Sequence, residues 1–182
     1  ILLARQNGNR QNESMMLNTL GLIAIEMKDP TAAQSYFEQS LSILRETNDR
    51  LYQAMPLNSL GNLYGSLGDY STAQAYYEQS LALAREIGHR QGEGFVLGNL
   101  GWTALSLGEY EKAHSYIEQG IQIARQAGSR LGEAYGLINL SLCTCILGEY
   151  ANALQNAIHG LQLVQEIGVR SGEAWAQICL GH

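Results

Sequence analysis

The chain has 182 residues, of which 46% are hydrophobic and 15% are charged, and its formal net charge is −6. This acidic balance, with Lys28 and Lys112 as the only lysines, excludes the basic stripe through which proteins bind nucleic acids. No stretch approaches the roughly 20 apolar residues that a membrane-spanning helix needs, so we expect no membrane partner.

A repeat of 40 residues runs through the whole sequence, and its whole units are 11–50, 51–90, 91–130 and 131–170. Residues 1–10 match the end of a unit, and residues 171–182 match the beginning of one. The clearest recurring positions are arginine at 10, 50, 90, 130 and 170 and alanine at 33, 73, 113 and 153. We interpret residues 1–182 as a single array that begins and ends within a repeat. The absence of an initiator methionine suggests a piece of a longer protein.

Each unit is expected to contain two helices. In the first unit, Asp29-Pro30 predicts a capped start for the second helix. In the second unit, Leu57, Leu60 and Tyr64 share one helical face, Gly68-Asp69 predicts the break, and a second apolar face follows. That second face consists of Ala73, Tyr77, Leu81 and Ala84. Glycines that predict left-handed helix ends stand at 8, 88, 128 and 168.

Small residues predict where the two helices of a hairpin touch. Glycine at 21, 61 and 101 and alanine at 33, 73, 113 and 153 would allow close approach. Two departures from the pattern are notable. Lys28 stands where other units have a turn glycine, and Pro56 lies inside a first helix, which should kink or start late.

One residue pattern carries a family resemblance: Leu57, Leu60-Gly61, Tyr64, Ala73 and Tyr77. It resembles the tetratricopeptide repeat, which implies an all-α fold, a right-handed α-solenoid of antiparallel helix hairpins that binds proteins. The usual repeat has about 34 residues and a proline near its end. Arginine or glutamine stands there in this chain, so we expect longer hairpins. The 40-residue variety resembles repeats of the Pins/LGN adaptors and of bacterial signalling proteins.

The sequence contains no catalytic motif, and we predict neither an enzyme nor a cofactor or metal site. The four histidines are dispersed, and Cys143 and Cys145 should point to different sides of a helix. Three cysteines suit a reducing cytoplasm better than a disulfide framework. Arginines at 90, 130 and 170 each precede a glutamate by three residues, which predicts ion pairs along the helix, with an arginine track for an acidic peptide as the alternative.

The resemblance implies that the first helices line a concave groove, whose contacts come from positions off the packing face. Large apolar residues and asparagines occupy those positions, and they can supply contact area and backbone hydrogen bonds to a peptide. The candidate binding residues are Met55, Asn58, Asn62, Phe95, Asn99, Trp102, Tyr135, Asn139 and Trp175. The alternative is that these residues only pack neighbouring first helices together.

These patterns favour a non-catalytic protein- or peptide-binding scaffold, an interaction arm of a larger cytoplasmic signalling or regulatory protein. A receptor module for a short signalling peptide, bound in the concave groove, is the alternative. A folded partner should protect a broad surface, whereas a peptide should protect only the inner rows of the groove.

The last partial repeat predicts end-to-end self-association. Residues 171–182 carry an apolar face with Trp175, Ile178 and Leu180, which a following unit would cover. Light scattering of the 182-residue chain should show association that rises with concentration and falls in Trp175→Glu. A clean monomer at high concentration would contradict this prediction.

Overall fold

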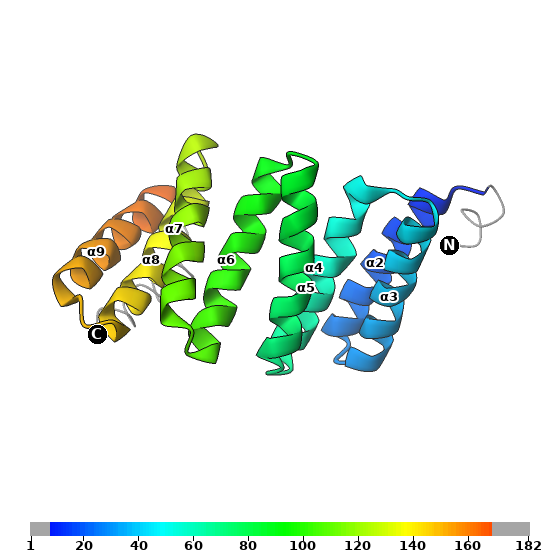
Figure 1. Ribbon diagram of the computed structural model, residues 1–182, viewed down its shortest axis with the longest axis horizontal. Helices are drawn as coiled ribbons and strands as arrows, with labels where there is room; N and C mark the ends of the chain where they lie inside the picture. Colours follow the sequence, from blue (N-terminus) through cyan, green and yellow to red (C-terminus); the bar gives the residue numbers. More distant parts are fainter. Residues whose placement is uncertain (1–7, 169–182) are drawn as a thin grey trace. The chain divides into compact units, whose positions relative to one another are not determined.

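The computed structural model describes residues 8–168, which form helices connected by short turns (Figure 1). The chain divides into two compact units, residues 1–89 and residues 90–182. The helices of the first unit are α2 (Arg10–Glu26), α3 (Pro30–Glu46), α4 (Arg50–Ser66) and α5 (Tyr70–Glu86). Those of the second are α6 (Arg90–Leu107), α7 (Tyr110–Gln126), α8 (Arg130–Ile146) and α9 (Tyr150–Ile167). The predicted all-α solenoid of antiparallel hairpins is confirmed, and no strand occurs between residues 8 and 168.

A left-handed residue recurs every 20 residues and separates consecutive helices. Seven glycines take this conformation, and Lys28 and Asn48 take it at the two positions without glycine, with φ of 59° and 54°. At Gly88 the N–H donates to the carbonyl of Arg85, and the next N–H, that of His89, donates to Ala84 at 2.8 Å. This pair of bonds is the Schellman arrangement, which satisfies the last carbonyls of a helix. The turns within hairpins and the turns between them thus share one geometry.

Side chains cap several helix starts as the sequence predicted. Asp29 and Asp69 accept hydrogen bonds from the backbone N–H groups three residues later, at 2.9 Å and 3.1 Å. Pro30 occupies the first helical position of α3, where its missing N–H has no consequence. The start of α4 differs from expectation. It begins at Arg50 with Pro56 inside it, so the expected late start is wrong.

In the hairpins α2–α3, α4–α5 and α6–α7, a glycine of the first helix faces a large side chain of the second. A methyl group placed on Gly61 would lie 2.5 Å from the ring of Tyr77, and one on Gly101 would lie 2.5 Å from Ile117. The side chain that faces the glycine therefore belongs to the residue four positions after Ala73 or Ala113, and not to the alanine itself. The α8–α9 hairpin lacks this contrast in size, since the small, buried Ser141 and Ala157 occupy the two corresponding positions.

A second close approach lies seven residues, about two turns, earlier along the first helix of each hairpin. The hydroxyl groups of Ser14 and Ser40 lie 2.8 Å apart, and Ser40 also donates to the carbonyl of Ser14 at 3.0 Å. Ser80 donates in the same way to the carbonyl of Ala54 at 3.0 Å. Gly120 and Gly160 occupy the matching positions of the second unit. The predicted close packing is confirmed. The contact where both helices carry small residues, however, lies at these positions and not at the glycines and alanines that the sequence analysis named.

Each unit has its own hydrophobic core. In the first unit, Phe37, Leu57 and Leu60 are fully buried between α2, α3, α4 and α5. In the second, Ile117 and Ile138 lie at the centre of a cluster that reaches from α6 to α9. Single hairpins bury little apolar surface, so stacking within a unit supplies the core. No helix between residues 8 and 168 is long and apolar enough to cross a membrane.

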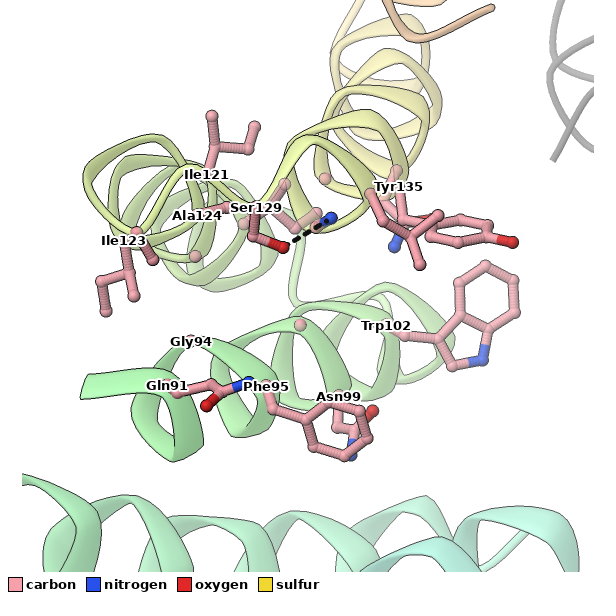
Figure 2. Close-up of a pocket in the computed structure, with 18 residues that line it drawn as sticks. Gln91, Gly94, Phe95, Asn99, Trp102, Ile121, Ile123, Ala124, Ser129 and Tyr135 are labelled. Carbon is pink, nitrogen blue, oxygen red and sulfur yellow. Dashed lines mark hydrogen bonds between the residues drawn. The ribbon is translucent and has the colours of Figure 1, made fainter. Parts of the chain in front are cut away.

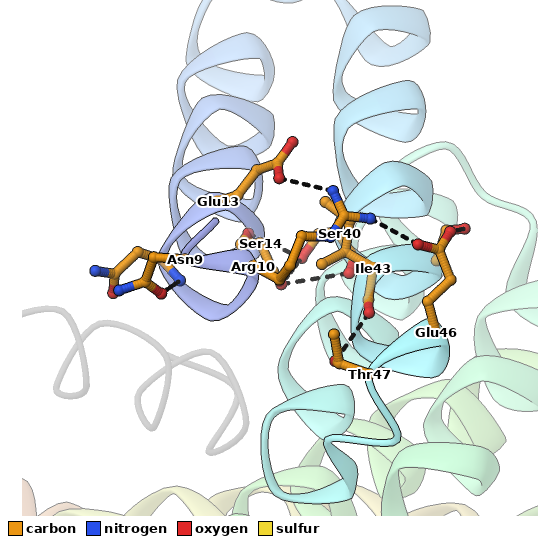
Figure 3. A network of polar contacts seen from close by, with 10 residues as sticks. Asn9, Arg10, Glu13, Ser14, Ser40, Ile43, Glu46 and Thr47 are labelled. Atoms are coloured by element: carbon orange, nitrogen blue, oxygen red, sulfur yellow. Dashed lines mark hydrogen bonds and ion pairs between the residues drawn. The ribbon is translucent and has the colours of Figure 1, made fainter. Parts of the chain in front are cut away.

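Ion pairs join the start of a first helix to the end of the second helix of the same hairpin. Arg10 contacts both Glu13 at 2.8 Å and Glu46 at 2.6 Å (Figure 3). The link over 36 residues recurs as Arg50 with Glu86 and as Arg130 with Glu166.

The ion pairs predicted along the helix are confirmed in part. Arg90 contacts Glu93 at 2.8 Å, as expected. Glu133, however, contacts Arg125 of the preceding helix at 2.7 Å, and Arg130 contacts Glu166. The third predicted pair, residues 170 and 173, lies outside the described residues, as does Trp175, so self-association stays a prediction.

The glycines of α4 provide a matched test of the hairpin contact. Gly61→Ala should destabilise the chain by about 1 to 3 kcal/mol, because the new methyl group meets the ring of Tyr77. Gly65→Ala should instead stabilise it by up to about 1 kcal/mol, since its methyl group would lie 3.8 Å from Ala73 and alanine favours the helix. Urea unfolding measures both changes. Equal shifts of the two midpoints would contradict the contact.

Candidate functional site: a pocket between α6, α7 and α8

A pocket of about 880 Å³ lies within the second unit, between the first helices α6 and α8 and the second helix α7. Figure 2 shows its lining side chains. Helix α7 supplies apolar side chains that are themselves buried, Ile117, Ile121 and Ile123. The pocket's volume falls in the range of about 300 to 1,000 Å³ that is usual for ligand sites.

Five of the nine predicted binding residues line this pocket. Phe95, Asn99 and Trp102 come from α6, and Tyr135 and Asn139 come from α8. Phe95 is 63% exposed and Trp102 is 40% exposed, whereas the other three are half-buried. In Figure 2, Trp102 and Tyr135 project toward the same side of the site from their two helices. Rings with this exposure offer contact area to a ligand beyond what packing between the helices uses.

The local sequence explains how these side chains reach the same space. Phe95, Asn99 and Trp102 follow one another at spacings of four and three, so they share one face of α6. Tyr135 and Asn139 do so on α8. Ser129 fixes the start of α8, because its hydroxyl accepts a hydrogen bond from the N–H of Gly132 at 3.3 Å.

The pocket is polar at a few points and uncharged. Among the described residues that line it, none is acidic, basic, histidine or cysteine. Its polar groups are the amides of Gln91, Asn99 and Asn139, the hydroxyls of Ser129 and Tyr135, and the indole N–H of Trp102. Such a lining can hydrogen-bond neutral polar groups and surround apolar ones. An ionised ligand group would lose its hydration there without gaining a counter-charge.

The remaining predicted residues lie elsewhere. Met55, Asn58 and Asn62 belong to α4 in the first unit, where Met55 and Asn62 are exposed. The side-chain oxygen of Asn62 accepts a hydrogen bond from the hydroxyl of Tyr77 at 2.7 Å, so this asparagine contributes to its own hairpin. Trp175 lies outside the described residues.

The sequence analysis missed the other residues of the pocket lining, most of which are glycines and isoleucines. Alignment of the repeats could have found one of them. Asn58 corresponds to Gly98 at a spacing of 40, whereas Asn99 corresponds to Asn139. The asparagines that the sequence analysis grouped together therefore occupy two different registers, and Gly98 stands in one of them.

The cysteines behave as expected from their spacing. Cys143 is buried and Cys145 is exposed, so they lie on different sides of α8. The thiol of Cys143 donates to the carbonyl of Tyr110 at 3.4 Å, and burial raises its pKa. No group of three or more metal-ligating side chains occurs among residues 8–168.

A comparison with protein families matches the tetratricopeptide repeat at residues 12–86 and 52–126. These two overlapping stretches cover more than half of the chain. A comparison with curated proteins found no match.

Solved structures share the fold at low identity. Aspartyl phosphate phosphatase F from Bacillus subtilis is 16% identical with a TM-score of 0.85, over 93% of this chain and 45% of that one. The apo form of RapI is 17% identical with a TM-score of 0.88, over 93% and 62%. The Rap conjugation gene regulator of the plasmid pLS20, in complex with the Phr* peptide, is 16% identical with a TM-score of 0.78, over 92% and 46%. The chain thus spans about half the length of these proteins.

The burial of Tyr77 leads to a prediction about alkaline stability. Burial raises the pKa of Tyr77 from 10.0 to about 12. The unfolded chain releases this proton from about pH 10, while the folded chain keeps it to about pH 12. The contribution of the protonated Tyr77 hydroxyl to the free energy of unfolding is therefore fully present below pH 10. It falls by about 2 to 3 kcal/mol between pH 10 and pH 12.

The variant Tyr77→Phe removes this dependence, and Phe37 shows that phenylalanine fits the same position of another hairpin. At pH 8 the variant should be less stable by about 1 kcal/mol, the loss of one hydrogen bond. At pH 12 the difference should vanish or reverse. Urea unfolding across this range measures it, with Tyr150→Phe as the control because that ring is 71% exposed. A difference that stays constant with pH would contradict the prediction.

Proposed function

Because the chain belongs to the tetratricopeptide repeat family, we propose that it is a non-catalytic scaffold that binds a protein partner through the first helices of its hairpins. The partner presents an extended peptide segment to the pocket between α6, α7 and α8. The chain serves as an interaction arm of a larger signalling or regulatory protein of the cytoplasm.

The observation that carries this proposal is the gathering of Phe95, Asn99, Trp102, Tyr135 and Asn139 around one pocket. The rings of Phe95 and Trp102 are large and substantially exposed. Aromatic residues often supply most of the binding energy in protein interfaces. The amides alternate with the rings along each helix face. An extended peptide has the matching pattern, with backbone polar groups between side chains that point to alternate sides.

The chemistry of the lining also favours binding over catalysis. General acid–base catalysis most often uses histidine, carboxylates or lysine, and a hydroxyl nucleophile needs such a base beside it. The described residues around this pocket include the hydroxyls of Ser129 and Tyr135 but no histidine, carboxylate, lysine or cysteine. The phosphatase in the name of one structural neighbour belongs to that protein, with which this chain shares 16% identity.

A receptor for a short signalling peptide is the second candidate. One neighbour of the same fold was solved in complex with the Phr* peptide, which supports this candidate for the present chain. The two candidates differ in the size of the protected surface. Hydrogen exchange in a complex with a folded partner should be slowed over many helices, whereas a peptide should slow it mainly along α6 and α8.

The double variant Phe95→Ala with Trp102→Ala tests the pocket. Peptides selected from a displayed random library against the 182-residue chain provide the ligands. The variant should bind them at least ten-fold more weakly, a loss of about 1.4 kcal/mol or more, because both rings contribute contact area. Titration calorimetry measures the affinity, and circular dichroism should show that helicity is retained.

The matched control is Leu107→Ala with Ile146→Ala. These residues are exposed on α6 and α8 but do not line the pocket. The affinity of this control double variant for the same peptides should equal that of the unchanged chain. If the Phe95 and Trp102 variant is less stable but its folded form binds the peptides with unchanged affinity, the two rings only pack the helices together and the proposal is wrong.

A further inference from the structure

Gly98 leaves an open space on α6 that the corresponding residues of the other first helices occupy. The equivalent positions hold Asn18, which is 4% exposed, the half-buried Asn58, and Ile138, which is 0% exposed. A methyl group placed on Gly98 would meet no atom within 4 Å outside its own helix turn. Gly98 is also one of the residues that line the pocket.

Packing within the protein accounts for other glycines of α6 but not for this one. A methyl group on Gly94 would lie 2.9 Å from Ile123, and one on Gly101 would lie 2.5 Å from Ile117. Glycine is unfavourable inside a helix, so it persists where something needs the space. At Gly94 and Gly101 that need is the approach of α7. At Gly98 the space opens into the pocket instead.

The surroundings of this space form a slot. Phe95 precedes Gly98 by three residues and Trp102 follows it by four, so the two rings flank it on the same face of the helix. Gly120 of α7 brings its own bare backbone close, since a methyl group placed there would lie 3.8 Å from the nitrogen of Gly98. Two rings and two glycines thus bound a region that admits a side chain from outside the chain.

We propose that the peptide segment bound in the pocket is uncharged and places one large apolar side chain over Gly98, between Phe95 and Trp102. This inference rests on the proposed function and adds the chemical class of the ligand. Charge complementarity supports an uncharged segment, because none of the described pocket residues could neutralise an ionised side chain. Gly98 is then a specificity-determining residue, since any side chain at that position competes with the ligand for the slot.

Substitution at Gly98 should change stability and affinity in opposite directions. Gly98→Leu fills the slot from within the protein, as Ile138 does at its position on α8. Its melting temperature should rise, and its affinity for the library-selected peptides should fall at least ten-fold. Gly98→Ala should also raise the melting temperature, with a smaller loss of affinity. The matched control Gly65→Ala, on α4 and outside the pocket, should raise the melting temperature with no loss of affinity.

The selected peptides provide a second readout that does not depend on the folding of any variant. One position should hold leucine, isoleucine, methionine or an aromatic residue in all of them. Its replacement by alanine should weaken binding to the unchanged chain at least ten-fold, and its replacement by lysine should weaken it further. Peptides without such a position, or with a charged residue there, would overturn the inference.

The outcomes separate this inference from the proposed function. If the peptides lose affinity for the Phe95 and Trp102 variant but bind Gly98→Leu unchanged, the pocket binds peptides and the slot over Gly98 is wrong. A lower melting temperature for Gly98→Leu would overturn the open space itself. A library that yields no binder, or binders indifferent to Phe95 and Trp102, would overturn the proposed function together with this inference.

Discussion

The regular spacing of the left-handed turns is the constraint on which the rest of the structure depends. A residue with positive φ every 20 residues ends each helix at the same length, so every helix presents the same face to its neighbours. Glycine takes this conformation at little cost, whereas Lys28 and Asn48 take it with a side chain. Asparagine adopts this conformation more readily than most residues, so Lys28 is the position where the surrounding hairpin has to impose the turn. Local preference for glycine reinforces it elsewhere.

Between these turns, the hairpins differ in the size of the residues at corresponding positions of their two helices. Gly61 receives the ring of Tyr77, while Ser141 faces the small Ala157 at the same place in another hairpin. Protein interiors are close-packed, so each hairpin has to fill this contact with the residues it has. The inner faces of the first helices are not held by this requirement, and there the second unit replaces side chains with glycine and gains a pocket.

Charged residues of the described part of the chain form ion pairs with one another and do not line the pocket. Arginines at the starts of first helices pair with glutamates at the ends of second helices, over 36 residues, and these exposed pairs add little stability individually. The pocket carries no charge among its described residues. Recognition there depends on ring surfaces, amides and the available space. A change at Gly98 can therefore alter the ligand without disturbing the interactions that hold the hairpins.

The sequence by itself determined the helices, their turns and the faces that look inward, because the 40-residue period and the helical spacing both act along one chain. The resemblance to the tetratricopeptide repeat, carried onto these positions, implied that Phe95, Asn99, Trp102, Tyr135 and Asn139 belong to one surface. Only the tertiary structure decided which of them share a pocket and which partner each charge finds. Those outcomes depend on distances between helices, and such distances follow from the volume of facing side chains. Gly98 is the clearest case, because the role proposed for it depends on the open space beside it, which the sequence does not show.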